Sequence, residues 1–495
     1  MSLNKSEFDS FAAQGHTRIP LVREVLADLD TPLSTYIKLA GGEYSYLFES
    51  VSGSEKASRY SIIGLSARQF FRATGNLVEI IEDGAIVDSF TSEDPLQAVR
   101  EYQHSFKAPD IEGLPRFTGG LVGYFSYDTI RYIEPSLGEN RHPDSLQTPD
   151  VLLMVSDEIL IFDKLKGRLF IVINVDPREP GVWESGQQRI DEIAQLLDQP
   201  LSHQANAVTS EVGENDFHSG FSREGYMQAV ERAREYIRAG DIMQVVLSQR
   251  MSIPYEAQPL NLYRALRTLN PSPYMYFMNL GDFQVVGSSP EILVQVDSGK
   301  ATVRPIAGTR PRGENEAEDL ALEKDLMADP KELAEHLMLV DLGRNDLGRI
   351  AEIGSVELTD RMVIERYSHV MHIVSNVVCD IRKEFDAIDV LRATFPAGTV
   401  SGAPKIRAME IIDELEPVKR GIYSGAVGYL GWNGNMDTAI AIRTSVIKDG
   451  MLNIQVGAGI VADSKPEMEW EETLNKGRAT FRAVAMAASG LRQLS

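Results

Sequence analysis

Short β-branched and aromatic runs, separated by turn residues, fill the first 195 or so residues. Residues 150–155 and 167–174 are two examples, the second reading Gly-Arg-Leu-Phe-Ile-Val-Ile-Asn. Such runs predict strands, because branched and aromatic side chains pack well on a pleated surface. From about residue 199 to residue 221 the sequence turns polar, as exposed boundaries do. A sheet-rich region is therefore predicted to precede that boundary.

The second half of the chain alternates helical and strand-like segments. Residues 222–239 have the pattern of a helix that ends at Gly240, and the strand-like run 244–249 follows. This alternation indicates an α/β or α+β arrangement. We expect two sequence regions, residues 20–195 and residues 222–490.

One short stretch in each region has a similar sequence. Residues 118–125 read Thr-Gly-Gly-Leu-Val-Gly-Tyr-Phe, and residues 423–430 read Tyr-Ser-Gly-Ala-Val-Gly-Tyr-Leu. Glycine within a strand often marks a close approach to another backbone. We therefore predict two glycine-bearing strands of this kind, and two copies are too few for a repeat architecture.

Charge and composition exclude several classes of protein. The 495 residues carry a formal net charge of -23, so a basic face for nucleic acid or anionic membrane is not expected. No apolar run approaches the roughly 18 residues that a membrane span needs. The single cysteine, Cys379, gives no internal disulfide and fits a reducing compartment, which predicts a cytoplasmic protein. Residues 304–313 hold three arginines, two prolines and two glycines, a stiff loop suited to a small anion.

Two glycine-rich stretches imitate nucleotide-binding motifs. Residues 457–459 follow a strand-like run, but residues 463–466 separate them from the next helix, whereas a dinucleotide fingerprint opens a helix directly. Residues 398–405 resemble a phosphate-binding loop, but the spacing differs and Pro404 removes a backbone donor. Neither stretch predicts a nucleotide site.

Two helical stretches carry glutamates three residues apart. Glu332 and Glu335 form one pair, and Glu469 and Glu472 form the other, with Lys476 four residues beyond Glu472. Each pair by itself is most simply a solvated helix face, and Glu472 with Lys476 an ordinary ion pair. If the two helices face one another, the four carboxylates would suit Mg²⁺, which prefers oxygen ligands.

Two further residues have two readings each, and a third has one default reading. Arg443 lies in a predicted alternating strand, residues 438–447, and either reaches solvent or binds a carboxylate in a pocket. Glu291 follows an apolar strand and a proline, and is either an exposed turn residue or a buried general acid with a raised pKa. His372, between apolar residues, is by default a core histidine.

Eight motifs occur together in one order and spacing between residues 288 and 473, and the likeness that they mark runs from about residue 20 to residue 485. They resemble those of the chorismate-utilising enzymes, and most closely the large subunits of anthranilate synthases. The motifs are Ser-Ser-Pro-Glu, Pro-Ile-Ala-Gly-Thr-Arg-Pro-Arg-Gly, Lys-Glu-Leu-Ala-Glu-His, Gly-Arg-Asn-Asp-Leu-Gly, Pro-Ala-Gly-Thr-Val-Ser-Gly-Ala-Pro-Lys, Ala-Ile-Arg-Thr, Gly-Ala-Gly-Ile-Val and Glu-Trp-Glu-Glu-Thr.

The resemblance implies one α/β (α+β) fold in which two large antiparallel sheets pack together with helices outside. Residues 20–195 would be the regulatory region and residues 222–490 the chorismate-binding catalytic region, closely associated. The implied metal is Mg²⁺, held by Glu335 and Glu472 with Glu332 and Glu469 close by. The implied substrate-binding residues are Gly308, Thr309, Tyr423, Arg443, Gly457, Ala458, Gly459 and Lys476.

The resemblance also implies roles in the reaction. Glu291 would be the general acid that protonates the departing 4-hydroxyl of chorismate while ammonia attacks C2. His372 is associated with the later loss of pyruvate from aminodeoxyisochorismate, and Thr399 lines the same pocket. The product would be anthranilate, made in the first step of tryptophan biosynthesis.

Two positions bear on the nucleophile. Relatives that use water typically have a lysine base where this chain has Gln244, and aminodeoxychorismate synthases typically have a nucleophilic lysine where it has Ala307. Both lysines are missing, which leaves direct attack by ammonia. The alternatives are aminodeoxychorismate synthase component I and a phenazine-type aminodeoxyisochorismate synthase.

A regulatory site and a partner are implied as well. Residues resembling the family's tryptophan feedback pocket are Glu49, Ser50, Pro273, Tyr274, Met275, Val427 and Tyr429, and Phe48 departs from the commoner leucine. The chain has no Cys-His-Glu glutaminase portion. A separate glutamine amidotransferase subunit is therefore the expected partner, with ammonium salts able to replace it in vitro.

Overall fold

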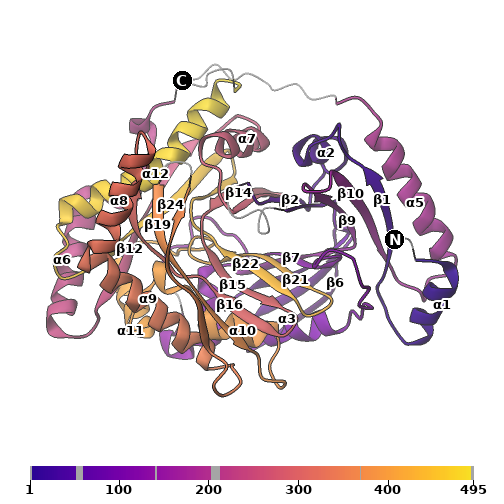
Figure 1. The fold of residues 1–495 in the computed structure, drawn as a ribbon, viewed down its shortest axis with the longest axis horizontal. Coiled ribbons are helices and arrows are strands. Elements are labelled where there is room, and N and C mark those ends of the chain that lie inside the picture. The colour runs from indigo at the N-terminus through magenta and orange to yellow at the C-terminus, as the bar shows by residue number, and fades with distance from the viewer. Residues whose placement is uncertain (1–2, 52–58, 140–141, 202–211, 368–369, 492–495) are drawn as a thin grey trace.

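Two antiparallel sheets of 12 strands each pack against one another, and helices cover their outer faces (Figure 1). The computed structural model describes residues 3–51, 59–139, 142–201, 212–367 and 370–491. The predicted fold class is confirmed.

The first sheet has the strand order β1 (Ile19–Leu26), β10 (Arg168–Val175), β9 (Glu158–Asp163), β3 (Tyr60–Gly64), β2 (Ser45–Glu49), β13 (Tyr274–Asn279), β14 (Phe283–Ser289), β23 (Thr444–Lys448), β24 (Met451–Ile460), β12 (Gln244–Pro254) and β11 (His218–Ser219), with β20 (Gly402–Ala403) paired to β12.

The second sheet has the order β17 (Ile306–Pro311), β19 (Val370–Asp380), β16 (Lys300–Val303), β15 (Ile292–Asp297), β22 (Met436–Ile440), β21 (Ala426–Gly431), β7 (Gly120–Phe125), β8 (Val151–Ser156), β4 (Gln69–Thr74), β5 (Leu77–Glu82) and β6 (Ala85–Thr91), with β18 (Glu357–Arg366) paired to β19.

The helices of the described residues are α1 (Lys5–Ala13), α2 (Pro32–Leu39), α3 (Pro95–His104), α4 (Ile130–Ile133), α5 (Val182–Leu197), α6 (Arg223–Ala239), α7 (Pro259–Leu269), α8 (Glu316–Ala328), α9 (Pro330–Gly348), α10 (Ala387–Thr394), α11 (Lys405–Leu415) and α12 (Pro466–Ala488). Short 3₁₀ turns are η1 (Tyr127–Thr129), η2 (Pro135–Leu137), η3 (Glu214–Asp216) and η4 (Gly398–Val400). Within these described helices, none has the length and apolar character needed to cross a membrane.

The two sequence regions follow the same path through the sheets. The N-terminal region forms β1 to β3 in the first sheet and β4 to β8 in the second, and it returns to the first with β9 and β10. The C-terminal region repeats this course with β12 to β14, then β15 to β22 apart from β20, then β23 and β24. Figure 1 shows the purple N-terminal strands and the orange and yellow C-terminal strands side by side in both layers.

The two halves meet at two strand pairs, β2 with β13 and β7 with β21. The second pair joins the two stretches of similar sequence, residues 118–125 and 423–430, and it places Gly123 opposite Gly428. A Cβ atom on Gly123 would lie 1.9 Å from the carbonyl oxygen of Leu152, and one on Gly428 would lie 2.0 Å from that of Asp437. The prediction of glycine-bearing strands that pass close to another backbone is confirmed.

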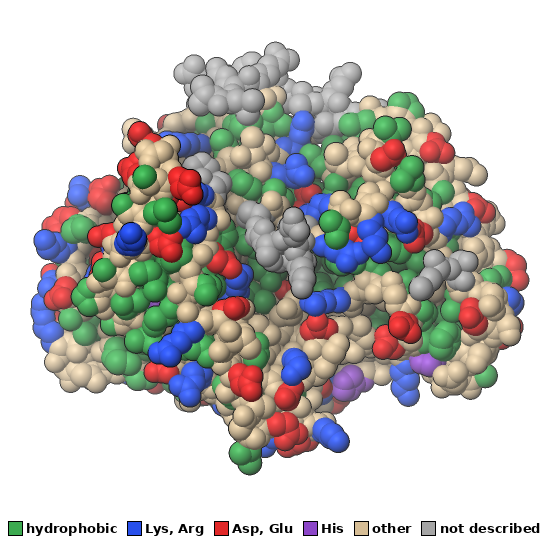
Figure 2. All heavy atoms as spheres, in the orientation of Figure 1, with side chains coloured by type: hydrophobic (Ala, Val, Ile, Leu, Met, Phe, Trp, Pro, Cys, Tyr) green, Lys and Arg blue, Asp and Glu red, His purple; other side chains and the backbone are tan. Residues whose placement is uncertain are grey.

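Hydrophobic side chains fill three layers. Tyr46 and Met278 of the first sheet meet Val122 and Val427 of the second between the sheets. A second cluster lies under α2, α5, α7 and α12 on the outer face of the first sheet, and a third lies under α3, α9 and α10 on the outer face of the second. On the molecular face in Figure 2, acidic and basic side chains are interspersed.

The predicted helices at the acidic pairs and at residues 222–239 are present. The Asp329 side chain caps α9 by accepting the N–H groups of Lys331 and Glu332, and α12 begins at Pro466. Helix α6 starts after Ser222 and ends at Gly240, whose φ of 84° is a left-handed value that glycine adopts readily. The polar stretch around 199–221 includes η3 and β11, while its residues 202–211 lie outside the described residues.

Candidate active site

Glu291 and Arg443 both lie where the chain passes from one sheet to the other. Glu291 separates β14 from β15, and Arg443 separates β22 from β23. The N–H of Ser288 donates to the carbonyl oxygen of Arg443 at 3.1 Å, which holds the two crossings together.

The expectation of one continuous strand over residues 438–447 is therefore wrong. Two strands in different sheets share the stretch, and Arg443 joins them with a left-handed φ of 50°. An alternating pattern persists through such a crossing because each strand keeps one buried face, so periodicity alone does not reveal the break.

Arg443 is a partly buried cation that makes no side-chain hydrogen bond or ion pair with the described residues. Burial lowers its pKa, and the nearby Glu291 carboxyl acts in the opposite direction. A desolvated guanidinium without a partner is costly unless an anion binds it. Arg443 therefore does not extend freely into solvent, and its binding of a carboxylate stays a prediction.

Glu291 is a buried carboxyl with 9% of its surface exposed. The hydroxyl of Thr399, on η4, donates to Glu291 Oε1 at 3.0 Å. Burial raises the pKa of Glu291 to about 8, although Thr399, Lys476 and Arg443 each act to lower it. The side chain is therefore protonated at neutral pH and able to donate a proton.

His372 and Thr309 lie on adjacent strands, β19 and β17. His372 Nδ1 is 2.9 Å from the carbonyl oxygen of Gly308 and 3.1 Å from the hydroxyl of Thr309. Because a carbonyl oxygen can only accept, we assign the proton to Nδ1, which leaves Nε2 as a base. Burial lowers the pKa of His372, so the ring is neutral and can accept a proton.

Lys476 of α12 connects that helix to β24. Its ammonium group donates to the carbonyl oxygen of Gly457 at 2.9 Å and lies 2.8 Å from Glu472 Oε1. A Cβ atom on Gly457 would come within 2.8 Å of the Tyr423 hydroxyl oxygen, and one on Gly459 within 2.7 Å of Gln244 Nε2. Glycine at both positions leaves room for those two side chains.

Ala458 faces away from this group. Its side chain lies in the hydrophobic cluster that includes residues of α6 and α11, because successive residues of a strand point to opposite faces. Any contact of Ala458 with a ligand in the cleft is thus restricted to its backbone.

The four glutamates come from α9 and α12 as predicted. Burial raises the pKa of Glu335, and the charges of Glu332 and Glu472 raise it further, so negative charge from both helices converges here. Glu472 is paired with Lys476, and Glu332 lies 3.7 Å from Arg310. Within the described residues, no three acidic or other ligating side chains are close enough to hold a metal ion.

The residues predicted for tryptophan lie at the junction of the two halves. Glu49 pairs with Met275 across β2 and β13, and its carboxylate accepts from Arg267 Nε at 2.9 Å. The Tyr274 hydroxyl donates at 3.0 Å to Asp437, which is paired with Tyr429. Ser50 follows β2, Pro273 precedes β13 and Val427 lies on β21.

Glu416 and Arg420 were not predicted as functional residues, yet they form a buried pair with 2.6 Å between Arg420 Nη2 and Glu416 Oε1. Arg420 Nη1 also donates to the carbonyl oxygen of Val400 at 2.7 Å, next to Thr399. The four-residue spacing of this pair is the same as that of a surface ion pair, so only burial distinguishes it.

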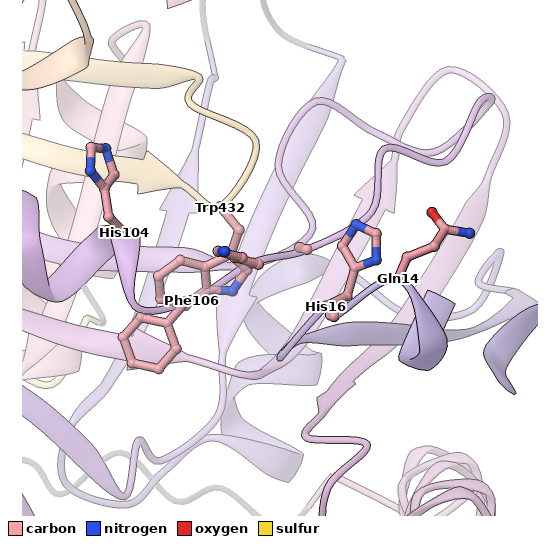
Figure 3. A pocket seen from close by; sticks show the side chains of 8 residues that line it. Gln14, His16, His104, Phe106 and Trp432 are labelled. Carbon is pink, nitrogen blue, oxygen red and sulfur yellow. The ribbon is translucent and has the colours of Figure 1, made fainter. Parts of the chain in front are cut away.

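An open pocket of about 480 Å³ lies apart from these residues (Figure 3). Phe106 and Trp432 lie at its centre, with His104 and His16 on either side. None of the predicted site residues lines it.

Residues 52–482 match the family model described as chorismate binding enzyme. The chain belongs to this family. The matched range includes Glu291, Arg443 and the four glutamates of α9 and α12.

Similar members of the chorismate-binding family cover nearly the whole chain. Anthranilate synthase component 1 of Pseudomonas putida is 60% identical over 98% of this chain and 99% of that protein. The same component of Aquifex aeolicus is 48% identical over 96% of each chain. The crystal structure of anthranilate synthase component I from Streptococcus pneumoniae superposes with a TM-score of 0.77 at 38% identity, covering 92% of this chain and 99% of that one.

Proteins with much lower sequence identity have a similar fold. The menaquinone-specific isochorismate synthase of Escherichia coli is 18% identical and has a TM-score of 0.70 over 97% of this chain and 98% of its own. At that identity the likeness concerns the fold alone.

Proposed function

We propose that this protein is the synthase subunit of an anthranilate synthase, which converts chorismate and ammonia to anthranilate and pyruvate. The observation that carries the proposal is a protonated, buried Glu291 near Arg443, a cation with no side-chain partner among the described residues, in a chain 60% identical to a protein named anthranilate synthase component 1. Chorismate needs an acid to protonate its leaving hydroxyl, which Glu291 can supply, and a cation to bind its carboxylate, which Arg443 can supply.

In the first step, Glu291 gives its proton to the departing 4-hydroxyl of chorismate while ammonia forms the bond to C2. Arg443 and the Thr309 hydroxyl bind substrate oxygens, and Lys476 fixes the position of Gly457 in the cradle. In the second step, Nε2 of His372 takes the C2 proton as the bond to the enolpyruvyl oxygen breaks. The ring becomes aromatic, the side chain leaves as enolpyruvate, and a proton returned from His372 or solvent to its methylene carbon gives pyruvate.

We further propose Mg²⁺ as cofactor, with Glu335 and Glu472 as its ligands and Glu332 and Glu469 nearby. Two carboxylates are a sufficient protein donor set, because Mg²⁺ keeps several waters and is commonly bound by one or two carboxylates together with substrate oxygens, so a cluster of three ligating side chains is not required. The charges of Glu332 and Glu472 also raise the pKa of Glu335. When bound, Mg²⁺ supplies positive charge that orients and polarises the substrate carboxylate.

Ammonia is the proposed nucleophile. Gln244 is buried and has an amide in place of a base, so it cannot deprotonate water. Ala307 on β17 offers no nucleophile to C2. We propose that a glutamine amidotransferase subunit supplies the ammonia, and that both proteins are cytoplasmic.

A coupled assay tests the main proposal. The purified chain with chorismate, Mg²⁺ and ammonium salt should produce anthranilate fluorescence and an equal amount of pyruvate. An amino intermediate that accumulates without pyruvate would instead identify an aminodeoxychorismate-type or phenazine-type enzyme. Glutamine should replace ammonium only when an amidotransferase subunit is added.

Tryptophan should inhibit this activity through the pocket formed by Glu49, Tyr274 and their neighbours. Tyr274→Phe removes the hydrogen bond to Asp437 that links β13 to β22, so we expect a higher tryptophan concentration for half inhibition with kcat little changed. Inhibition curves measured with and without the substitution check this. Equal sensitivity in both proteins would contradict the placement of the site.

A further inference from the structure

The Gly-Arg-Asn-Asp-Leu-Gly motif and Lys405, at the end of the motif that carries Thr399, have no role in the reaction described above, yet they meet in the structure. Asp346 of α9 and Lys405 of α11 form an ion pair with 2.8 Å between Nζ and Oδ2. Lys405 also donates to the carbonyl oxygen of Thr394 at 3.3 Å. Both side chains are largely buried. A buried ion pair of this kind contributes little net stability compared with apolar packing, so stability alone does not explain its presence.

A small cavity of about 50 Å³ connects this pair with the catalytic acid. Asp346, Glu291 and Thr399 are among its lining residues, and Leu342 and Val303 contribute apolar wall. Water needs a polar site with a volume of at least about 10–15 Å³ accessible to its centre, so this cavity has room for water and offers it polar partners. Glu291 uses one carboxyl oxygen for Thr399, and its other oxygen has no hydrogen-bond partner in the described part of the chain.

The chemistry requires a proton source at this point. Glu291 loses one proton to the leaving hydroxyl in each turnover and must regain it before the next. The ammonium group formed on C2 releases the balancing proton to solvent, so the cycle closes with no other reactant. While substrate or product occupies the active site, water in the cavity can still reach the Glu291 carboxylate from the side of α9.

We propose that the cavity holds water which returns a proton to Glu291, and that Asp346, oriented by Lys405, passes that proton into the cavity. The inference rests on the proposed function, because it assigns a path to the acid of that reaction. Asp346 does not touch the substrate, and it acts through water on Glu291.

Rapid-quench measurement of anthranilate with Asp346→Asn tests the path. Glu291 begins protonated at pH 7, so the first turnover should keep the wild-type rate, while later turnovers should slow at least tenfold. The result is a burst of one anthranilate per site followed by a slow steady state. Asp341→Asn, the same change on the exposed side of α9, should show no burst.

A second variant leaves the ion pair intact. Val303→Leu adds a methylene group to the cavity wall, and it should give the same burst with a smaller slowing of later turnovers. This measurement decides the matter if the Asp346 variant does not fold.

Three outcomes would overturn the proposal. Equal slowing of the first and later turnovers would mean that the pair only positions the segment around Thr399. A higher half-saturating ammonium concentration, with no burst, would make the cavity a route for the nucleophile. Unchanged kinetics in both variants would leave no role for the cavity. Absence of anthranilate in the wild type would instead refute the proposed function.

Discussion

Replacing Glu291 with glutamine should lower kcat for anthranilate formation by about 10² to 10⁴, the usual contribution of a general acid. The amide keeps the size of the side chain but has no proton to give to the departing hydroxyl. Steady-state fluorescence assays with saturating ammonia measure the loss. Glu384→Gln, the same change at an exposed position, serves as the control and should retain wild-type turnover.

The pH profile provides a sharper test of the same residue. The Glu291 carboxyl has a pKa of about 8, and the protonated form is the active one. Wild-type kcat should therefore be full below that pH and fall as the pH rises through about 8. In Glu291→Gln this decline should vanish along with most of the activity. A variant that keeps both high turnover and the decline would remove Glu291 from the mechanism.

Glu335→Gln and Glu472→Gln should each abolish activity while leaving the protein folded. Each substitution removes one of the two proposed oxygen ligands of Mg²⁺, and calorimetric titration with Mg²⁺ should show weaker binding in both variants. Glu467→Gln is the matched control, since Glu467 is exposed in the first turn of α12. Wild-type turnover in either ligand variant would contradict the metal assignment.

The stability of these variants can be anticipated from the charges. The pKa of Glu335 is raised in the folded protein, so its ionised form disfavours folding at neutral pH and the glutamine variant should melt no lower than wild type. Glu472→Gln breaks the pair with Lys476, in which both side chains are 46% exposed. Such pairs contribute about 0–1 kcal/mol. Thermal unfolding followed by circular dichroism therefore separates lost catalysis from lost folding.

Local signals in the sequence were sufficient for several elements near the site. The Asp-Pro start and the apolar spacing predicted α9. Residues 463–466 predicted that the strand before them ends and that the next helix begins near Glu467. Both signals are local, because helix starts and caps depend on neighbouring residues. The two glycine-bearing strands were recognisable for the same reason. That they pair with one another, with Gly123 opposite Gly428, depends on residues about 300 positions apart and was not predictable from either stretch.

Other features depended on the environment of a side chain. Glu291 could have been an exposed turn residue, and its burial follows from the crossing between the two sheets, from which the raised pKa results. Arg443 looked like part of one strand, and the Glu416–Arg420 pair had the spacing of a surface pair. Periodicity reports which residues face a core, but it does not report which sheet a strand joins.

The sequence by itself determined the helices that carry the acidic pairs, the order of the eight motifs, and the absence of lysine at Gln244 and Ala307, because these depend only on residue identity and near neighbours. The tertiary structure decided which distant residues share a site. It set Thr399 against Glu291, gave Arg443 no side-chain partner in the part of the chain that the structure describes, and joined Asp346 to Lys405 beside a cavity. The physical reason is that desolvation and hydrogen bonding, which set charge and proton position, arise only when segments far apart in the chain are packed together.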